Sequence, residues 1–581
     1  MTVEIAFVLL LFIAAAALLV TEIVPPEVTS LSLVLLLAAS GVMTVEEAFQ
    51  GFSSEAIVVL ACVMILSRRL SESGAMSGLS AWLAGRGGRA PAAIVARLMA
   101  SSAALSMVFS NTSTTAVMMP IAGDAADKAK VSPGRFMMPM AFASMMGGCA
   151  TLIGTSANIA ASGVITRMGL EPFGMFEFFW VGFAVTGAGI VTVVLLGNHF
   201  IPERERGVGR VLREDQFLAD LIVVAEGKAD GAAFSDLALA DLGATALAID
   251  IETGRVAAHA RRKLHAGDHI LVHASAAALS RLAADERFQL DGVAEGAPVE
   301  VTAEAILLPG SRWTGLSVAG MRRRLAPDVS VIGVRRAGYD RTARIGLMRL
   351  RAGDILSLAG NAEGMERIDD DVDIYLSGRS EQVAPSRREG WYTLVALFAA
   401  IIVSSLGLLP MGVALLSAVM ALILAGRFTL RDAFSKVSWH ILILIGGMSS
   451  LGLAMLQTGA ADWLAGGILR HVAPLGQTAV LIMLSLLTIL LTQALSNAAA
   501  ALTVLPVAVA IADGLGIDPR PLAVIVTLSA SLSFIAPLEP ALLLVYGKGH
   551  YRLRDFVLAG VPLTAVSVAI VLLLVPLLWP F

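Results

Sequence analysis

The sequence has little of what soluble enzymes and secreted proteins depend on. Charged residues make up only 15% of its 581 residues, and the two cysteines, Cys62 and Cys149, both lie in apolar segments. We interpret them as small buried hydrophobic residues, because two isolated thiols form no disulfide framework. The net charge of -4 gives no strongly basic surface, which argues against nucleic-acid binding. The sequence also shows no nucleophile motif, metal-ligand cluster or Walker motif, so we expect neither an enzyme, nor a primary pump, nor a bound cofactor.

Apolar residues, in contrast, are abundant and unevenly placed. They make up 57% of the chain, which is typical of a membrane protein. Residues 202–390 nevertheless carry 54 of the 88 Asp, Glu, Lys and Arg residues. We therefore predict two membrane halves around a soluble insert. The predicted domains are a first transmembrane repeat at 1–201, insert modules at 202–295 and 296–389, and a second transmembrane repeat at 390–581.

The two membrane halves repeat each other at a nearly constant offset of 385 or 386 residues. The matching positions are Thr44 with Ala48-Phe49 and Thr429 with Ala433-Phe434, Ser73-Gly74-Ala75 and Thr458-Gly459-Ala460, and Ser110-Asn111 with Pro120 and Ser496-Asn497 with Pro506. A constant offset over some seventy residues indicates an ancient duplication.

Each half shows the same series of apolar segments long enough to cross a bilayer as helices. We place spans near residues 3–20, 27–42, 53–71, 136–166 and 178–200, and near 392–408, 411–427, 438–456, 521–547 and 556–580. The first segment lacks the positive start of a signal peptide, so we interpret it as a span. A longer stretch in each half, 92–125 and 476–512, is broken by Ser-Asn and is either two spans or a re-entrant hairpin. Five spans with a hairpin that does not cross would make the halves inverted repeats.

The distribution of Lys and Arg supports the arrangement with inverted halves. If the first helix starts outside, the loops predicted inside are the basic ones; they hold Arg68, Arg69, Arg86, Arg89, Lys128, Lys130, Arg135, Arg204, Arg206, Arg210, Arg427, Arg431, Lys436, Lys548, Arg552 and Arg554. The positive-inside rule then predicts a multi-pass protein of the inner (plasma) membrane, with a cytoplasmic insert and both termini outside. One predicted inner loop, TEIVPPEVTS, is acidic and counts against this arrangement.

Polar residues gather at the breaks in the apolar segments. They are FSNTSTTAVMMP at 109–120, GGCATLIGTSANIA at 147–160 and FIAPLEPALLL at 534–544. Backbone that leaves the helix at bilayer depth survives where it lines a site, and helix ends with amides and hydroxyls there bind ions. The hydroxyls of Ser113, Thr114 and Thr115 have an alternative role, which is bonding to their own helix. Glu539 also has an alternative, a structural ion pair with Lys548 or Arg552.

These paired Ser-Asn stretches, GGCATLIGTSAN and the closing LLLVYGKGHYRLRDF resemble the divalent anion/sodium symporter family of the ion transporter superfamily. The resemblance implies an all-α polytopic fold with inverted repeats of five helices and a re-entrant hairpin each. It also implies cotransport of sulfate or carboxylates with sodium, by an elevator motion in a homodimer. The implied cation ligands are Ser106, Ser110, Asn111 and Gly154 in one site and Thr492, Asn497 and the backbone near Glu539 in the other. The implied anion ligands are Ser110, Asn111, Thr112, Thr155, Ser496 and Asn497.

The sequence departs from the family pattern at three places. Ala498 follows Ser496-Asn497 where a threonine is common, and Gly-Thr-Ser-Ala-Asn replaces Gly-Thr-Pro-Pro-Asn, which favours the sulfate-type branch. Glu539 stands where small or hydroxyl residues are usual. We hypothesise that Glu539 either ligates a cation directly or carries a proton as the coupling ion, since a lone carboxylate would repel a dianion.

The insert contains a repeat of its own. RRKLHAGDHILVHASAAALSRL at 261–282 parallels LMRLRAGDILSLAGNAEGMERI at 347–368, and each predicts an Ala-Gly-Asp turn, a strand and a helix. The two small α/β modules resemble TrkA-C domains, which some sulfate-type members carry. GVGR at 207–210 lacks the rest of a dinucleotide fingerprint. The modules are therefore either a dimerisation scaffold or a sensor for a small-molecule regulator.

Together these features predict a secondary transporter in membrane lipid that carries a small anion with a cation. Sodium is the expected coupling ion, and sulfate or a dicarboxylate is the expected substrate. Two alternatives stay open within transporters: proton-coupled symport, and sodium/proton antiport through Glu539. A ligand-gated channel is a third alternative from another class, although the sequence has no TVGYG-like filter.

Overall fold

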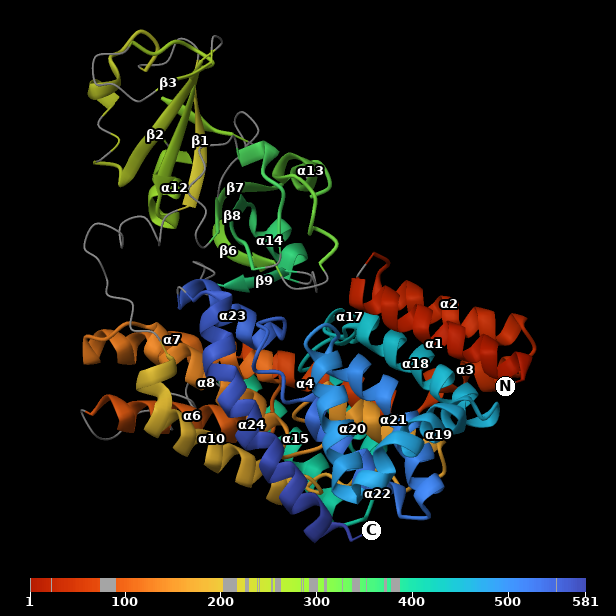
Figure 1. The fold of residues 1–581 in the computed structure, drawn as a ribbon. Helices are drawn as coiled ribbons and strands as arrows, with labels where there is room; N and C mark the ends of the chain where they lie inside the picture. Colours follow the sequence, from red (N-terminus) through yellow and green to blue (C-terminus); the bar gives the residue numbers. More distant parts are fainter. Residues whose placement is uncertain are drawn as a thin grey trace. The chain divides into compact units, whose positions relative to one another are not determined.

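The computed structural model divides the chain into two compact units, residues 1–203 with 385–581 and residues 204–384 (Figure 1). The structure describes residues 2–580 except 22, 74–89, 202–216, 225–228, 238, 240, 252–253, 257–262, 284, 286, 292–300, 308–310, 326–327, 337–344, 352, 370–373, 378–386 and 550. The predicted boundaries near 202 and 295 fall outside the described residues, as does most of the proposed repeat at Ser73-Gly74-Ala75. They stay predictions.

The first unit is helical, and the described helices of its two halves follow the same order, except that the counterpart of the helix at Ala460–Val472 falls outside the described residues. The first half comprises α1 (Val3–Thr21), α2 (Pro26–Ala39), α3 (Val45–Phe49), α4 (Glu55–Glu72), α6 (Pro91–Ser106), α7 (Asn111–Ala129), α8 (Gly134–Gly148), α9 (Ser156–Arg167) and α10 (Phe179–Phe200). The second half comprises α15 (Arg387–Ser405), α16 (Met411–Leu424), α17 (Leu430–Ser435), α18 (Trp439–Gln457), α19 (Ala460–Val472), α20 (Gln477–Thr492), α21 (Asn497–Leu515), α22 (Pro519–Ala530), α23 (Pro540–Lys548) and α24 (Leu553–Leu578).

The repetition extends to the helix ends. Thr44 caps α3 and exchanges hydrogen bonds with Glu47 in a capping box, and Thr429 does the same with Asp432 at the start of α17. In such a box the threonine hydroxyl accepts a backbone N–H while the acid accepts the N–H of the threonine. The sequence offset of 385 between Thr44 and Thr429 therefore corresponds to a repeated local structure.

Six helices among the described residues are long and apolar enough to cross a bilayer, and six shorter apolar helices accompany them. The predicted spans at 136–166 and 521–547 are each broken in the structure, at 149–155 between α8 and α9 and at 531–539 between α22 and α23. The long stretches predicted to contain a Ser-Asn break form the helix pairs α6–α7 and α20–α21. The chain is thus a mostly helical polytopic membrane protein.

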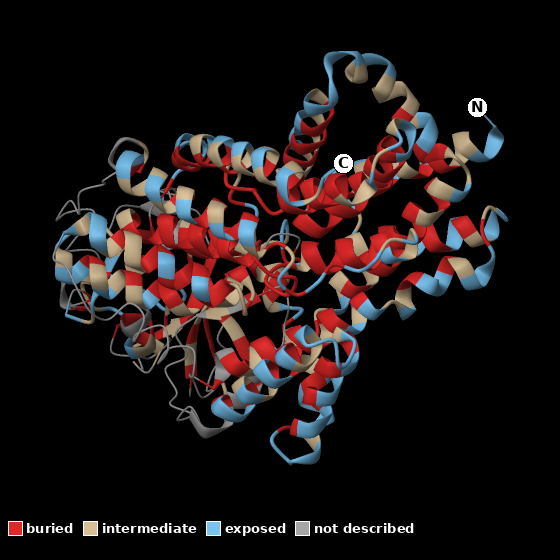
Figure 2. Cartoon of the chain, turned by 90° about the horizontal axis from the view of Figure 1, so that it is seen from below, coloured by how far each residue is buried: buried red, intermediate tan, exposed pale blue. Residues whose placement is uncertain are grey.

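Burial separates the inner helices of this unit from the outer ones. Every residue of α22 from Pro521 to Ala530 is buried, and α8 and α21 are buried over most of their length. Figure 2 shows fully buried helical segments in red and partly exposed ones in tan and pale blue. Outer helices instead expose large apolar side chains, such as Leu10 of α1, Leu195 of α10 and Leu573 of α24. Apolar surface of this kind fits a lipid environment. The helix breaks therefore lie among buried helices rather than on the lipid-facing side.

The second unit is built on one antiparallel sheet with strand order β3-β2-β4-β1-β7-β8-β6-β9, with β5 also paired to β1. Its elements are β1 (Phe217–Val223), β2 (Ala244–Ile251), β3 (Gly254–Val256), β4 (His269–Ala274), α12 (Ala276–Ala283), β5 (Phe288–Leu290), β6 (Val301–Leu307), α13 (Val318–Arg322), β7 (Val329–Arg335), β8 (Ile355–Gly360), α14 (Ala362–Asp369) and β9 (Ile374–Ser377).

The two predicted Ala-Gly-Asp turns have the same geometry. Gly267 and Gly353 adopt φ values of 85° and 84°, a region that favours glycine. The carboxylates of Asp268 and Asp354 accept backbone N–H groups three residues earlier, at 2.9 and 2.8 Å. Each turn leads into a strand and then a helix, as the sequence predicted. The insert therefore repeats the order strand, helix and strand after each turn, as β4-α12-β5 and β8-α14-β9, while the resemblance to TrkA-C domains stays a prediction.

A buried carboxylate lies where the two modules of the insert meet. Asp220 of β1 is 4% exposed, and its Oδ2 accepts the backbone N–H of Ile345 at 3.0 Å. Beside it, Arg322 of α13 forms an ion pair with Asp291 at 2.8 Å. β1 and β7 also pair through Leu218 and Val334. Contacts from both modules thus surround one carboxyl group.

Candidate ion and substrate site

Each Ser-Asn pair lies where one helix of a pair ends and the next begins. Ser110 is the N-cap of α7, and its hydroxyl accepts the backbone N–H of Ser113 at 3.2 Å. Ser496 is the N-cap of α21 and accepts the N–H of Ala499 at 3.3 Å. Serine is favoured at this position because its oxygen satisfies a backbone donor that the helix leaves free. The polar stretch at 109–120 therefore includes a helix start inside an apolar region.

The two asparagines are held in the same way in both halves. Ser106 donates its hydroxyl hydrogen to Oδ1 of Asn111 at 2.8 Å, and Thr492 donates to Oδ1 of Asn497 at 2.8 Å. Both asparagines are largely buried, with 5% and 7% of their surface exposed. Because a hydroxyl donor faces each amide oxygen, the amide NH₂ groups point elsewhere. The structure thus pairs Ser106 with Asn111 and Thr492 with Asn497, while their roles as cation ligands stay predictions.

The hydroxyls after Asn111 do not all bond to their own helix. Thr115 pairs with Ser144 of α8 at 2.9 Å, and Ser113 pairs with Ser110 at 2.9 Å. The hydroxyl of Thr114 is buried and has no hydrogen-bond partner among the described residues. The alternative that these hydroxyls bond only to their own backbone is therefore wrong for Thr115.

The break between α8 and α9 packs closely against the first Ser-Asn pair. A Cβ atom on Gly148 would lie 2.2 Å from Oδ1 of Asn111 and 3.1 Å from Cγ2 of Thr155, and one on Gly154 would lie 2.4 Å from the carbonyl oxygen of Gly148. Real Cβ atoms do not approach oxygen so closely, so both positions require glycine. Thr155 caps α9 by accepting the N–H of Asn158 at 3.2 Å.

Asn158 carries an unpaired oxygen in this break. Its Nδ2 donates to the carbonyl of Thr151 at 2.9 Å, which fixes the orientation of the amide. Its Oδ1 has no partner among the described residues, although the side chain is fully buried. A buried acceptor without a donor is costly and suits a bound cation or water. Asn158 was not among the residues predicted to bind an ion or the substrate.

Each helix break is also bonded to the neighbouring Ser-Asn turn. In the first half Thr151 donates to the carbonyl of Met107. In the second half the N–H of Ala536 donates to Oε1 of Gln493 at 3.0 Å, and Ser533 donates to the carbonyl of Thr492 at 3.3 Å. Met107 and Gln493 correspond at the offset of 386. These two equivalent residues therefore bond to their neighbouring breaks through different groups, a backbone carbonyl in Met107 and a side-chain oxygen in Gln493. No sequence motif predicted these bonds.

One side-chain contact connects the halves across the two breaks. The hydroxyl of Thr155 lies 3.4 Å from that of Ser531, at the start of the second break. No ion pair among the described side chains includes Glu539, and the side chain of Lys548 lies outside them. The predicted role of Glu539 therefore stays a prediction.

The chemistry of this arrangement suits ions of both signs. Four helices, α7, α9, α21 and α23, begin at the two Ser-Asn turns and the two breaks. Helix N-termini and amide NH₂ groups attract anions. Hydroxyl and amide oxygens held 2.8 Å apart, as in Ser106 and Asn111, are ligands of a kind that small hard cations accept.

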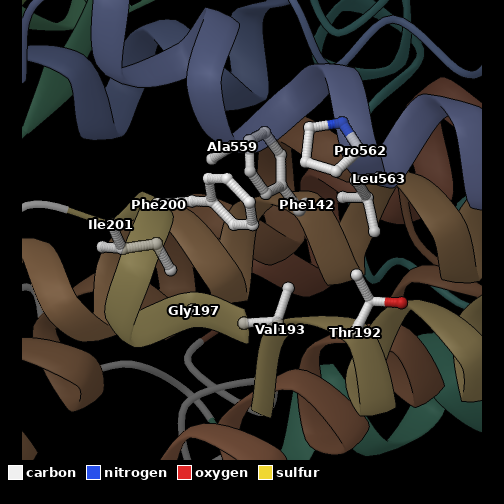
Figure 3. Close-up of a pocket in the computed structure, with 9 residues that line it drawn as sticks. All are labelled: Phe142, Thr192, Val193, Gly197, Phe200, Ile201, Ala559, Pro562 and Leu563. Atoms are coloured by element: carbon white, nitrogen blue, oxygen red, sulfur yellow. The ribbon is translucent and has the colours of Figure 1, made fainter. Parts of the chain in front are cut away.

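A separate apolar crevice lies between α8, α10 and α24 (Figure 3). It is lined by Phe142, Thr192, Val193, Gly197, Phe200, Ile201, Ala559, Pro562 and Leu563. Its one hydroxyl, on Thr192, donates to the carbonyl of Ala188 in its own helix. The crevice contains none of the predicted site residues and offers no charge or free donor to an anion.

Buried helix breaks with bonded polar turns, inside a bundle with an apolar exterior, define a polytopic membrane transporter. The family described as CitMHS, citrate transporter, matches residues 16–529, and the chain belongs to this family, within the ion transporter superfamily.

The chain is 28% identical over 600 residues to an uncharacterized transporter of Synechocystis sp., covering 99% of this chain and 97% of the relative. It is 28% identical over 610 residues to the uncharacterized transporter YfbS of Escherichia coli (strain K12), covering both chains fully. A sodium/sulfate cotransporter of Chlamydomonas reinhardtii is 26% identical over 260 residues, 43% of this chain and 29% of that protein.

Proposed function

We propose that the protein is a sodium-coupled symporter of a small divalent anion, with sulfate or a dicarboxylate as substrate. The observation that carries this proposal is the repeated pair of bonds from Ser106 to Asn111 and from Thr492 to Asn497, both 2.8 Å long. The family name refers to citrate, and one relative is named as a sodium/sulfate cotransporter. Both names support an oxyanion or carboxylate substrate.

The two cation sites would form on the oxygens of the repeated pairs. The first would use Ser106, Ser110, Asn111 and Gly154, and the fully buried unpaired oxygen of Asn158 adds a candidate ligand to it. The second would use Thr492, Asn497 and the backbone near Glu539. The anion would contact Ser110, Asn111, Thr112, Thr155, Ser496 and Asn497, where helix N-termini and amide donors favour negative charge.

Transport would follow alternating access around these turns. Bonds such as that from Ala536 to Gln493 support motion of each turn together with its neighbouring break as one body. We propose that the halves are inverted repeats and that this body moves in an elevator fashion within a homodimer of the inner (plasma) membrane. The insert would be cytoplasmic and composed of two TrkA-C-like modules that dimerise or bind a small-molecule regulator.

The test is uptake of radiolabelled sulfate, succinate and citrate into proteoliposomes. An inward sodium gradient is compared with an inward proton gradient at matched membrane voltage, and empty liposomes set the background. Sodium-driven uptake of one of these anions supports the proposal. Uptake without any gradient dependence, or no uptake of any of the three, contradicts it.

A second candidate rests on the position of Glu539, which directly precedes α23 in the second break. A carboxyl group at the site could carry the coupling proton, giving proton-coupled symport or sodium/proton antiport. In that case the proton gradient drives anion uptake in the same liposomes, or sodium moves against protons without any anion. If Glu539 carries the proton, Glu539→Gln would abolish the proton dependence of uptake. If Glu539 only ligates sodium, the same replacement would change the sodium dependence of uptake.

A further inference from the structure

An arginine of the second half holds a loop of the first half. Arg520, at the start of α22, makes two parallel hydrogen bonds to Glu177, from Nε to Oε1 and from Nη2 to Oε2, both at 2.8 Å. The same guanidinium donates to the backbone carbonyls of Glu171 at 3.0 Å and Pro172 at 3.3 Å. The two charged side chains are only 22% and 12% exposed, so solvent screens this paired contact less than a contact on the open surface. Segment 171–178, between α9 and α10, is therefore fixed to the other half of the chain.

Further contacts hold the segment in a defined conformation. Oε2 of Glu177 also accepts the backbone N–H of Gly174 at 2.7 Å. The ring of Phe173 packs edge-on against that of Phe178, with the ring centroids 4.9 Å apart. The N–H of Phe173 donates to the hydroxyl of Ser162 in α9 at 3.0 Å. The carboxylate of Glu177 thus joins the fold of the segment to its partner arginine.

The segment in turn holds the first break. The carbonyl of Met175 accepts the N–H of Leu152 at 3.0 Å. The peptide group that contains this N–H also contains the carbonyl of Thr151, which accepts a hydrogen bond from Nδ2 of Asn158 at 2.9 Å. Because a peptide group is planar, a bond to its N–H also restrains the direction of its carbonyl. That carbonyl orients the amide of Asn158, whose buried Oδ1 has no partner among the described residues.

The second half has a contact at the equivalent place, with different chemistry. Tyr551 lies between α23 and α24, and its hydroxyl accepts the backbone N–H of Met138 in α8 at 2.8 Å and donates to the carbonyl of Gly134. The helices α8 and α22 each precede a break. In both halves, therefore, the loop that follows the break and its helix is bonded to the helix that precedes the other break. Of these two contacts, the one at Arg520 is an ion pair.

We propose that Arg520 is a positioning residue of the first cation site, acting through segment 171–178 and Asn158. The segment holds the peptide group between Thr151 and Leu152, and this peptide group directs Oδ1 of Asn158 toward the ion. The described hydrogen bonds of Arg520 reach none of the implied ligands, so its loss should weaken cation binding without removing a ligand. This inference rests on the proposed function, because it assumes that a cation binds at the first Ser-Asn turn.

The test replaces Arg520 by Gln and by Lys and measures amide hydrogen exchange and sodium binding in the purified full-length protein. Sodium binding is followed as thermal stabilisation, with choline replacing sodium at constant ionic strength. In Arg520→Gln the N–H of Leu152 should exchange at least about tenfold faster. The sodium concentration for half-maximal stabilisation should also rise at least about tenfold. Arg520→Lys keeps the charge but not the paired bonds, so its effects should have the same direction and be smaller, and it decides the test if Gln disturbs folding.

Arg470→Gln is the matched control. Arg470 is exposed on α19, and its Nε donates to the carbonyl of Gly466 in its own helix at 3.2 Å, so both measurements should stay unchanged. A role of Arg520 in stability alone would lower the melting temperature without changing the sodium requirement, and that result would overturn the inference. Unchanged exchange at Leu152 would overturn it as well.

A double replacement tests whether Arg520 acts through Asn158. Asn158→Ala should itself raise the sodium requirement, and adding Arg520→Gln should then raise it little further, because residues that act through one another are not additive. Fully additive effects would overturn the inference. Uptake of the three anions into proteoliposomes tests the proposed function separately. Sodium stabilisation that depends on Arg520 in a protein that takes up no anion would support the inference and contradict the symport proposal, whereas no stabilisation of the unchanged protein by sodium would overturn both.

Discussion

The hydroxyl oxygen of Thr492 lies 2.8 Å from Oδ1 of Asn497 and 2.9 Å from the carbonyl oxygen of Ala530, two acceptors that share its one hydrogen. Thr492 thereby links the end of α20, the start of α21 and the end of α22. The corresponding residue of the first half, Ser106, makes the same bond to Asn111 at 2.8 Å. A small hydroxyl side chain thus positions the asparagine in both halves.

Replacement of Thr492 by Val should impair transport more than folding. Valine keeps the shape of threonine but leaves Oδ1 of Asn497 without its donor, which costs about 1–3 kcal/mol. We expect the sodium concentration for half-maximal uptake to rise at least about tenfold. Thr192→Val is the control, because the Thr192 hydroxyl bonds only to its own helix. Equal effects of the two changes would show that the orientation of Asn497 is unimportant.

Replacement of Gly148 by Ala should abolish uptake. The new Cβ atom would lie 2.2 Å from Oδ1 of Asn111, so the asparagine or the break must move. We expect the protein to lose about 1–3 kcal/mol of stability and uptake to fall by at least about 100-fold. Gly187→Ala is the matched control, since nothing lies within 4 Å of its Cβ position. Melting temperature and uptake of both variants check the prediction; normal uptake by Gly148→Ala would contradict it.

The sequence predicted the local parts of the site and missed the contacts between distant parts. Ser110-Asn111 and Ser496-Asn497 were found because a duplication repeats them at a fixed offset, and the helix breaks were found because polar residues interrupt apolar runs. The contact of Thr155 with Ser531 joins different halves, so no local pattern signals it. Gln493 was missed for a related reason, since Met107 at the corresponding position bonds through its backbone instead.

The same distinction applies to the fold. The Ala-Gly-Asp turns at Gly267 and Gly353 were predicted, because a positive φ followed by an aspartate that accepts a backbone N–H is a local property. The pairing of β1 with β7 and the burial of Asp220 depend on how the two modules meet. Alternation of apolar residues gives the faces of a strand but not its neighbour.

Replacement of Gln493 by Met, the residue of the first half, should loosen the second break. Oε1 of Gln493 accepts the backbone N–H of Ala536 at 3.0 Å, and methionine leaves this N–H unsatisfied at a cost of about 1–3 kcal/mol. We expect faster hydrogen exchange at Ala536 and a lower uptake rate at an unchanged sodium requirement. The reverse change, Met107→Gln, is the control, because its backbone carbonyl keeps the bond from Thr151. Unchanged exchange at Ala536 would contradict the role given to Gln493.

Replacement of Asp220 by Asn should stabilise the insert, and increasingly so as the pH rises. Burial raises the pKa of Asp220, and the charge of Asp291 adds to this, whereas the N–H of Ile345, His269 and Arg322 lower it. When the pKa of a carboxyl group is higher in the folded than in the unfolded protein, its contribution to stability is complete below the unfolded pKa of about 3.9. That contribution is lost as the pH rises through the folded pKa. Asparagine still accepts the N–H of Ile345 and avoids the buried charge, so we expect a gain on the order of 1 kcal/mol at neutral pH.

Asp285 provides a control of opposite sign. Its hydrogen bonds to Arg287 lower its pKa, so its contribution to stability is present above the unfolded value and is lost as the pH falls through the folded one. Asp285→Asn should therefore destabilise the insert at neutral pH, and this effect should disappear in acid. Hydrogen exchange of β1 and β4 in the full-length protein between pH 4 and pH 8 measures both variants. If Asp220→Asn lost stability at high pH as Asp285→Asn does, the buried carboxylate would be a stabilising link between the modules rather than a cost.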